Sequence, residues 1–219
     1  MKLIANQIVF HYVKQGAGPS LILLHGSGEN LELFQNQMAL FARSFTVYAF
    51  DSRNHGKTEK TDDYTYETHA SDLAAWISEL KLEHPLILGF SDGAISAMML
   101  AISQPTLFKK MVLMGGNLGI SDWKEEMLAL VKVEYSENGD RLLKMMLEQQ
   151  TIDAKNFATI SAKVLIVSGE FDLFVPYMYE RMLSNFKDAS HLIVQGCNHS
   201  SYFDKGEEFF GEIVDFLED

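Results

Sequence analysis

The chain has 219 residues, with 30 acidic and 18 basic side chains and a formal net charge of −12. Its length favours one domain, or one domain with a modest insertion, that is large enough to bury a core. The acidic balance would repel phosphate backbones and the basic residues form no run, so nucleic acid is excluded as a partner.

No apolar run approaches the roughly 20 residues that a helix needs to cross a bilayer. The N-terminus meets polar residues before it could form the apolar core of a signal peptide. The single cysteine, Cys197, cannot form an internal disulfide bridge, in agreement with a reducing compartment. We therefore expect a cytoplasmic protein with no membrane partner, and the residues carry no signal for an oligomeric state.

Apolar runs of strand length alternate with segments of helical periodicity, a pattern typical of an α/β protein with a mostly parallel sheet and helices on both faces. A hairpin is predicted over residues 2–5 and 8–13. The buried strands that follow are predicted at 20–24, 46–50, 85–89, 110–114, 163–167 and 191–194. Helices are predicted over 68–80, 94–103 and 206–217, and Pro176 opens another.

The alternation is interrupted between residues 117 and 161, where two helical patterns follow each other with no strand between them. These patterns cover residues 121–135 and 139–150, and Ser121 is the expected N-cap of the first. We interpret residues 117–161, called the cap segment below, as a small helical lid on a core formed by residues 1–116 and 162–219. An ordinary crossover with one extra helix is the alternative.

The strongest local signal is the segment Gly89-Phe90-Ser91-Asp92-Gly93, which lies directly between a predicted strand and a predicted helix. A nucleophile elbow needs small residues around its serine because the turn from strand to helix is strained and crowded. The turn lifts the hydroxyl above the sheet, where the free amides of the helix face a developing oxyanion. Ser91 is therefore the candidate nucleophile.

A serine hydroxyl becomes nucleophilic when a base removes its proton, and a carboxylate must orient that base. His199 follows the last predicted strand, so we expect it at the same sheet edge as Ser91. Asp172, in the loop after strand 163–167, is the favoured carboxylate. The alternatives are Glu170 in the same loop and, more distantly, Asp188 and Asp204.

A tetrahedral intermediate also needs two hydrogen-bond donors for its oxyanion. We expect the backbone N–H groups of Asp92, directly after the nucleophile, and of Ser27, in the glycine-rich loop after strand 20–24. The same loop does not fit a dinucleotide, because Leu31 stands where the third glycine of that fingerprint belongs. No spacing of metal ligands such as H-E-x-x-H occurs, so no metal is expected.

Five segments occur in a characteristic order along the chain: His25 to Gly28, Asp51 to Gly56, Gly89 to Gly93, Gly169 to Pro176, and Gly196 to His199. Together they make the chain resemble an α/β-hydrolase-fold protein of the small serine esterase type, from the first hairpin to the last helix. The resemblance implies that His25-Gly26 shapes the oxyanion loop and that residues 51–56 form a structural turn. His25 and His55 are therefore read as architectural.

The implied reaction is hydrolysis of a small-molecule carboxylic ester through an acyl-enzyme, which needs no cofactor. Thioesters, lactones, amides and carbon–carbon bonds stay open as targets of the same three residues. A small-molecule sensor that kept the fold and signals through its lid is another alternative, because fold alone does not fix function.

An apolar substrate pocket is expected from large side chains at the same sheet edge: Phe34, Phe90, Leu118, Trp123, Met127, Phe174 and Met178. Asp92 places a carboxylate beside the nucleophile. We interpret its side chain as pointing away into a helix-capping role, with rejection of anionic substrates as the alternative.

Overall fold

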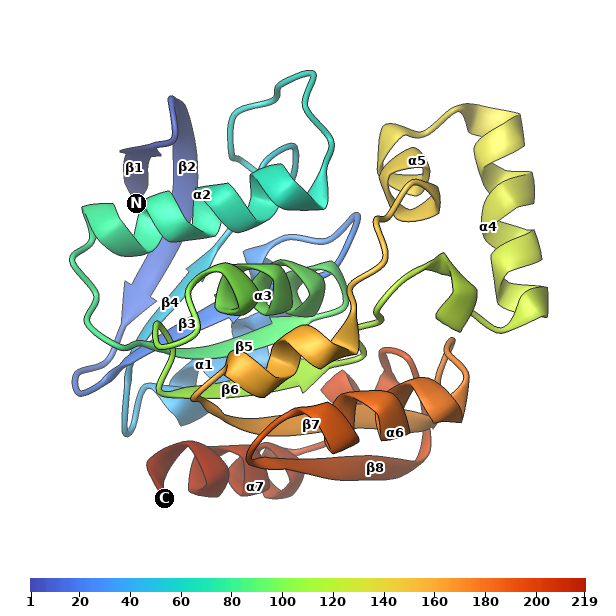
Figure 1. Cartoon of the computed structure of the whole chain (residues 1–219). Coiled ribbons are helices and arrows are strands. Elements are labelled where there is room, and N and C mark those ends of the chain that lie inside the picture. The colour runs from blue at the N-terminus through green and yellow to red at the C-terminus, as the bar shows by residue number, and fades with distance from the viewer.

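Eight strands form one sheet in the order β1-β2-β4-β3-β5-β6-β7-β8 in the computed structural model, which describes residues 1–219 (Figure 1). β1 and β2 pair antiparallel, β2 pairs antiparallel with β4, and all remaining pairs are parallel. The α/β fold class is thereby confirmed. The strands are β1 (Lys2–Ala5), β2 (Ile8–Gln15), β3 (Ser20–Leu24), β4 (Thr46–Phe50), β5 (Leu86–Phe90), β6 (Lys110–Met114), β7 (Lys163–Phe171) and β8 (Ala189–Asn198).

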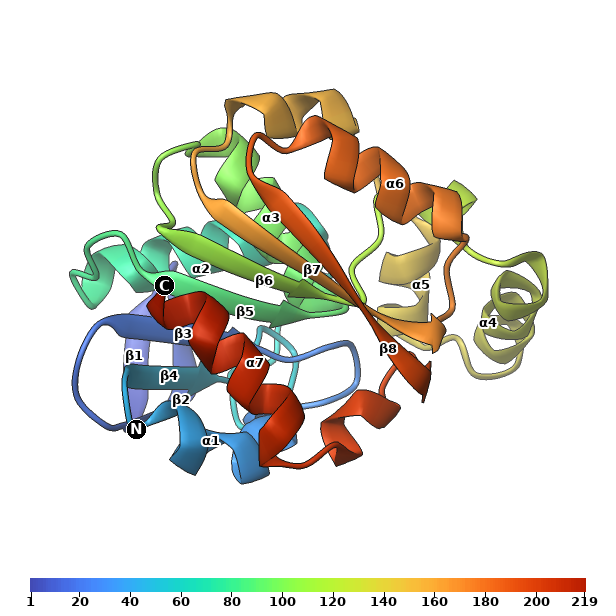
Figure 2. The same cartoon turned by 90° about the horizontal axis from the view of Figure 1, so that it is seen from below.

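Helices cover both faces of the sheet, and Figures 1 and 2 show α2, α3 and α6 on one face and α1 and α7 on the other. None of the helices is both long and apolar enough to cross a membrane. Their bounds are α1 (Gln35–Phe41), α2 (Tyr66–Glu79), α3 (Asp92–Ser103), α4 (Glu125–Asn138), α5 (Arg141–Leu147), α6 (Pro176–Asn185) and α7 (Glu207–Glu218). Four short 3-10 turns are η1 (Leu31–Phe34), η2 (Ile120–Asp122), η3 (Ala154–Thr159) and η4 (Ser201–Asp204).

Each face of the sheet has its own hydrophobic core. On the face of α2 and α3, Trp76 is fully buried and packs on the rings of Tyr12, Tyr48 and Phe50. The other core joins α1 and α7, where Phe41 meets Phe210 edge to face. All residues of the central strands β5 and β6 are buried, as expected for parallel strands covered on both sides.

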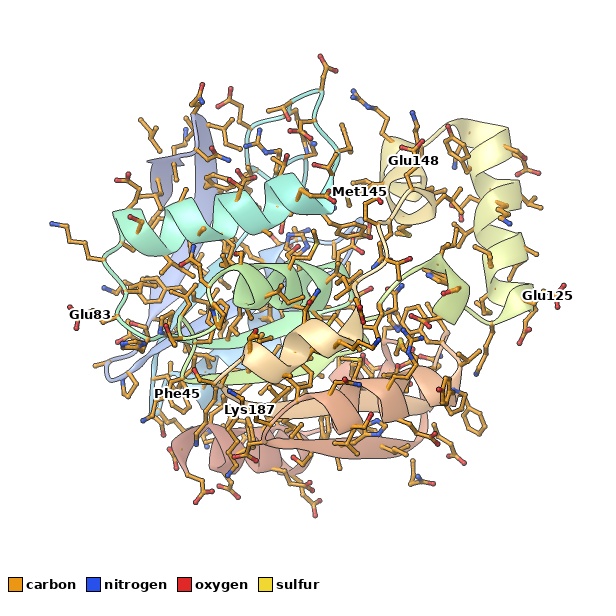
Figure 3. The ribbon with its side chains drawn as sticks, viewed as in Figure 1. Phe45, Glu83, Glu125, Met145, Glu148 and Lys187 are labelled. Atoms are coloured by element: carbon orange, nitrogen blue, oxygen red, sulfur yellow. The ribbon has the colours of Figure 1, made fainter.

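The cap segment leaves the fold after β6 and returns before β7. Near its start and after α5, the segment is joined where the Ile152 N–H donates to the Leu118 carbonyl at 2.7 Å. Between these two residues α4 buries none of its residues, whereas Met145 of α5 is only 3% exposed. Figure 3 shows Glu125 at the start of α4, pointing away from the rest of the molecule, and Met145 on the side of α5 that faces the core.

The last part of the cap segment belongs to the main core. Phe157 in η3 is fully buried and stacks on Phe186, which follows α6, with ring centroids 4.2 Å apart. The part that stands away from the sheet is therefore α4 and α5 with their connections.

Several local features differ from the expected elements. The N-cap of α4 is Lys124, and Ser121 lies in η2, because Trp123 is extended and forms an antiparallel bridge with Phe174. The helix α1 was not predicted, since its seven residues are too few for a clear period. β7 and β8 each extend four residues beyond their predicted ends at Val167 and Val194.

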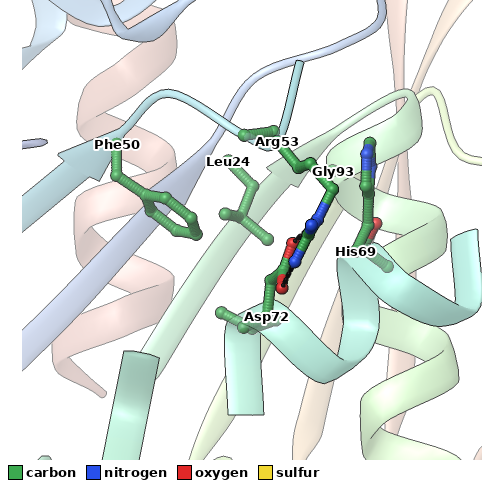
Figure 4. A pocket seen from close by; sticks show the side chains of 9 residues that line it. Leu24, Phe50, Arg53, His69, Asp72 and Gly93 are labelled. Carbon is green, nitrogen blue, oxygen red and sulfur yellow. Dashed lines mark hydrogen bonds and ion pairs between the residues drawn. The ribbon is translucent and has the colours of Figure 1, made fainter. Parts of the chain in front are cut away.

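A buried ion pair ties the loop after β4 to α2. Two nitrogens of Arg53 donate to the carboxylate of Asp72 at 2.7 and 2.6 Å, and both side chains are less than 10% exposed. Figure 4 shows the two groups face to face, with His69 of α2 beside them. Asp72 also accepts from Asn6 at 2.6 Å, so one carboxylate joins three segments of the fold.

We predict that Asp72→Ala lowers the free energy of unfolding by about 3–5 kcal/mol, because it leaves the Arg53 guanidinium buried without its partner. Urea unfolding measures this loss. The matched control is Asp62→Ala, which removes the exposed partner of Arg141 and should leave the urea midpoint nearly unchanged. Equal midpoints for the two variants would contradict the structural role given to Asp72.

Candidate active site

Ser91 stands in a strained turn between β5 and α3. Its φ of 50° lies in the left-handed region, which is rare for a residue with a side chain. A Cβ added to Gly89 would lie 2.6 Å from Gly93, and one added to Gly93 would lie 2.5 Å from the Leu24 carbonyl oxygen. Both glycines are therefore required for β3, β5 and α3 to meet this closely, as the sequence motif predicts.

The three polar side chains expected at the sheet edge lie in hydrogen-bonding distance of one another. His199 Nε2 is 3.1 Å from Ser91 Oγ, and His199 Nδ1 is 2.7 Å from Asp172 Oδ1. Ser91 Oγ makes no capping bond to α3, so the hydroxyl is available to the imidazole. The arrangement can pass the serine proton to a base that a carboxylate holds in one tautomer.

Strand register explains how Asp172 and His199 become neighbours. Beyond a β-bulge, Phe171 of β7 pairs with Asn198 of β8, and the two polar residues directly follow this pair. Gly169 permits the close approach of the strands, since a Cβ there would lie 2.4 Å from the Asn198 carbonyl oxygen. The extension of both strands past their predicted ends thus positions the site.

The Asp172 carboxylate is almost completely buried yet has a lowered pKa. Burial by itself raises this pKa, but the hydrogen bond and charge of His199 and the N–H groups of Leu173 and Gly169 outweigh that effect. The carboxylate is therefore ionised at neutral pH and can stabilise an imidazolium.

The alternative acids do not reach the imidazole. Glu170 is exposed and accepts from the Gly196 N–H at 2.8 Å, across the β7–β8 pair. Asp188 precedes β8 at the opposite end of the sheet, and Asp204 lies in η4. Neither makes a hydrogen bond to His199.

The glycine-rich loop after β3 is held by two neutral histidines. His25 Nδ1 donates to the Gly26 carbonyl at 2.7 Å, while His25 Nε2 accepts from the Ser52 N–H at 3.0 Å. His55 Nε2 accepts from the Gly28 N–H at 3.1 Å. Burial lowers the pKa of His25 to about 4, and it also lowers the pKa of His55. Both rings therefore act as fixed acceptors that join the loop to the turn 51–56, in line with their architectural interpretation.

The two amides expected to hold an oxyanion are free of protein acceptors. Neither the Ser27 N–H nor the Asp92 N–H donates to another group of the chain. Ser27, Ser91 and Asp92 line the same cleft. The geometry is thus open to an oxygen at this point.

Asp92 does not cap α3, and that interpretation of its side chain is wrong. Asp92 Oδ1 accepts from the Tyr66 hydroxyl at 2.8 Å, because α2 brings this tyrosine over the start of α3. Asp92 Oδ2 and Ser27 Oγ are both buried, and the Ser27 hydroxyl lies near enough to the carboxylate to donate to it. Burial raises the pKa of Asp92 to about 6, although the Tyr66 hydroxyl partly offsets the shift.

A cleft of about 430 Å³ opens above Ser91 and His199, a size that suits a small ligand. Of the predicted pocket residues, Phe90, Trp123 and Met127 line it. The other four lie outside, and their assignment to the pocket is wrong because they pack elsewhere. Leu118 and Met178 belong to the core of α2 and α3, Phe34 belongs to the core of α1, and Phe174 packs behind Trp123 and His199.

Several lining residues were missed by the sequence analysis. From α4 come Leu130, Val131 and Glu134, which continue the face of Met127 at helical spacing; this period was the available signal. Other missed residues are Glu29, Tyr66, Asn117, Leu143, Met146, Leu173 and Ser200.

The cleft is acidic: Glu29, Asp92 and Glu134 give it three carboxyl groups, and no Lys or Arg lines it.

No group of three or more His, Cys, Asp or Glu side chains in the structure has the arrangement of a metal site.

Gly115, directly after β6, is a further residue that sequence reasoning missed. Its φ is +57°, and a Cβ there would lie 2.8 Å from His199 Cε1 and 2.9 Å from the Tyr202 hydroxyl. The missing side chain at this position makes room for the imidazole.

We predict that Gly115→Ala slows the reaction of Ser91 with a fluorophosphonate at least about tenfold, because a small displacement of a catalytic base is costly. Gly139→Ala is the matched control: its φ is also left-handed, at +65°, but its Cβ would meet nothing within 4 Å. Mass spectrometry of the labelled chain gives both rates. If the two variants slow labelling equally, backbone strain and not crowding of His199 is the cause.

Comparison with known proteins places this chain in a family. The model of the alpha/beta hydrolase fold matches residues 19–134. Human serine hydrolase BPHL (Homo sapiens) is 28% identical, with 99% of this chain and 86% of that protein covered. A 2-hydroxy-6-oxononadienedioate/2-hydroxy-6-oxononatrienedioate hydrolase of Paraburkholderia xenovorans is 25% identical, with 97% and 91% covered. The solved enol-lactonase of Burkholderia xenovorans LB400 shares the fold, with a TM-score of 0.83 at 20% identity and full coverage of both chains. The chain is a member of the alpha/beta hydrolase family.

Proposed function

We propose that this hydrolase cleaves small carboxylic esters through an acyl-enzyme, with Ser91 as nucleophile, His199 as general base and Asp172 as the orienting acid. The observation that carries the proposal is the position of one imidazole between a strained serine and a buried, ionised carboxylate. The resemblance to a protein named a serine hydrolase supports the same chemistry.

In the first step His199 Nε2 takes the proton of Ser91 as the hydroxyl oxygen attacks the ester carbonyl carbon. The N–H groups of Ser27 and Asp92 then donate to the oxyanion, each contributing about 2.7–4 kcal/mol to the lowering of the barrier. Asp172 stabilises the imidazolium, which protonates the leaving alcohol. His199 then deprotonates a water, which attacks the acyl carbon; the bond to Ser91 Oγ breaks, the imidazolium returns its proton to that oxygen, and the acid leaves.

The charges of the cleft favour neutral or cationic esters over anionic ones. An anionic substrate would lose its hydration beside Glu29, Asp92 and Glu134, with no basic side chain to compensate. The relative from Paraburkholderia xenovorans is named for a dicarboxylate substrate, and this cleft lacks the cations that such a substrate would need.

We predict that a fluorophosphonate labels Ser91 and that Ser91→Ala abolishes both labelling and hydrolysis of p-nitrophenyl butyrate. Asp172→Asn should lower kcat by about 10⁴-fold, because the histidine tautomer is no longer fixed. Glu170→Gln is the matched control and should retain the wild-type rate. A folded wild-type chain that neither labels nor turns over would end the proposal, and a larger effect of Glu170→Gln would move the acid role to that residue.

We predict a charge ranking among p-nitrophenyl esters of similar length. The 4-(trimethylammonio)butyrate and 5-methylhexanoate esters should exceed the glutarate monoester at least about tenfold in kcat/KM at pH 7.5. Protonation of Asp92 below pH 6 removes one repelling charge, so the disadvantage of the glutarate ester should shrink at pH 5.

Because the ratio of two substrates is compared at each pH, titration of the catalytic base cancels. Asp92→Asn should reduce the pH dependence of this ratio. A glutarate ester that matches the neutral ester at pH 7.5 would show that the carboxylates of the cleft do not select the substrate.

A further inference from the structure

The loop from His25 to Glu29 is closed on itself by its last side chain. Glu29 Oε2 accepts from the Gly26 N–H at 3.0 Å, and the Glu29 N–H lies 3.4 Å from the Gly26 carbonyl oxygen. A Cβ added to Gly26 would be 2.9 Å from Glu29 Oε2 and 3.0 Å from the Phe90 ring, so the carboxylate fills the space beside the glycine. Glu29 thus bridges the start and end of the loop.

Ser27 lies between two anchored amides. The amide on one side, of Gly26, donates to Glu29, and the amide on the other side, of Gly28, donates to His55. Glycines at both positions leave this backbone little intrinsic stiffness, and Gly28 has a φ of +73°. The Ser27 N–H shares a planar peptide unit with the Gly26 carbonyl, which accepts from His25 Nδ1 at 2.7 Å. The remaining freedom of this peptide unit is limited by the hydrogen bonds of the Gly26 and Gly28 amides on either side of it.

A carboxylate is an unfavourable choice for this position on electrostatic grounds alone. Glu29 is half-buried in the cleft, near the Asp92 carboxyl and the His199 ring. Glu134 of α4 lines the same cleft. Burial raises the pKa of Glu29, and the Gly26 N–H only partly offsets this. A negative charge here also opposes an oxyanion in the same cleft. The hydrogen bond that Glu29 accepts from the Gly26 N–H offsets part of this electrostatic cost and explains why an acceptor occupies this position.

We propose that Glu29 is a positioning residue: its carboxylate holds Gly26 so that the Ser27 N–H is aimed at the oxyanion. This inference rests on the proposed function, because it assigns a role within the same acyl transfer. It requires an acceptor that reaches the Gly26 N–H, and it does not require the negative charge.

Two variants of Glu29 separate the effect of side-chain length from the effect of charge. Glu29→Gln keeps the chain length and an acceptor oxygen but removes the charge, whereas Glu29→Asp keeps the charge but shortens the side chain by one methylene. Glu32→Ala is the control, since Glu32 is exposed on the adjoining turn and its side chain makes no hydrogen bond.

Each variant is assayed for kcat and KM with p-nitrophenyl butyrate, and for inhibition by a trifluoromethyl ketone, whose adduct with Ser91 carries an oxyanion. Glu29→Asp should lower kcat about 10- to 100-fold, with KM changed less than about threefold, because the lost interaction acts in the transition state. The inhibition constant for the ketone should rise by a similar factor. Glu29→Gln should stay within about fivefold of wild type in all three values, and Glu32→Ala should not change them.

Wild-type rates for Glu29→Asp would overturn the proposal, and so would a Glu29→Gln variant as slow as Glu29→Asp, which would make the charge the active feature. A loss confined to KM, with an unchanged ketone inhibition constant, would also overturn it, because the oxyanion would then not be involved. Thermal melting and labelling of Ser91 in every variant distinguish these outcomes from a failure of the proposed function. If the proposed function itself were wrong, the wild-type chain would neither be labelled nor hydrolyse the ester.

Discussion

The pairing of Phe171 with Asn198 at the carboxyl ends of β7 and β8 is the constraint on which the site depends. It sets Asp172 and His199 side by side as they leave the sheet. The parallel order β5-β6-β7-β8 brings Ser91, which follows β5, to the same edge. The imidazole must then reach past the end of β6, and Gly115 leaves that path open because it has no side chain. Residues distant in sequence therefore meet through strand register.

The loops around these three residues are fixed by hydrogen bonds, and the histidines among the bonding groups can accept them in only one protonation state. His25 and His55 accept backbone N–H bonds and must be neutral to do so, and their burial keeps them neutral. Asp92 accepts from Tyr66 on one oxygen, and its other oxygen is buried near the Ser27 hydroxyl. The resulting cleft is acidic and is lined on one side by α4, which buries none of its own residues.

Much of this could be read from the sequence, and the failures share one cause. The strand-ending motifs locate Ser91, Asp172 and His199 because residues that follow parallel strands gather at one edge. The same reasoning locates Phe34 and Met178 at that edge but not the direction of their side chains, which is set by packing of α1 and α6 against the sheet. It likewise misassigned Asp92, since its partner Tyr66 comes from a helix 26 residues earlier in the chain. Glu29 and Gly115 act through contacts that no local pattern encodes.

A crystal structure of the chain after reaction with a phosphonate ester would test the proposed oxyanion site, because the phosphonyl oxygen stands in for the oxyanion of the tetrahedral intermediate. We expect phosphorus bonded to Ser91 Oγ, with the phosphonyl oxygen within hydrogen-bond distance of the N–H groups of Ser27 and Asp92. His199 should remain hydrogen-bonded to Asp172. A phosphonate attached to another side chain, or an oxygen directed away from both amides, would contradict the proposal.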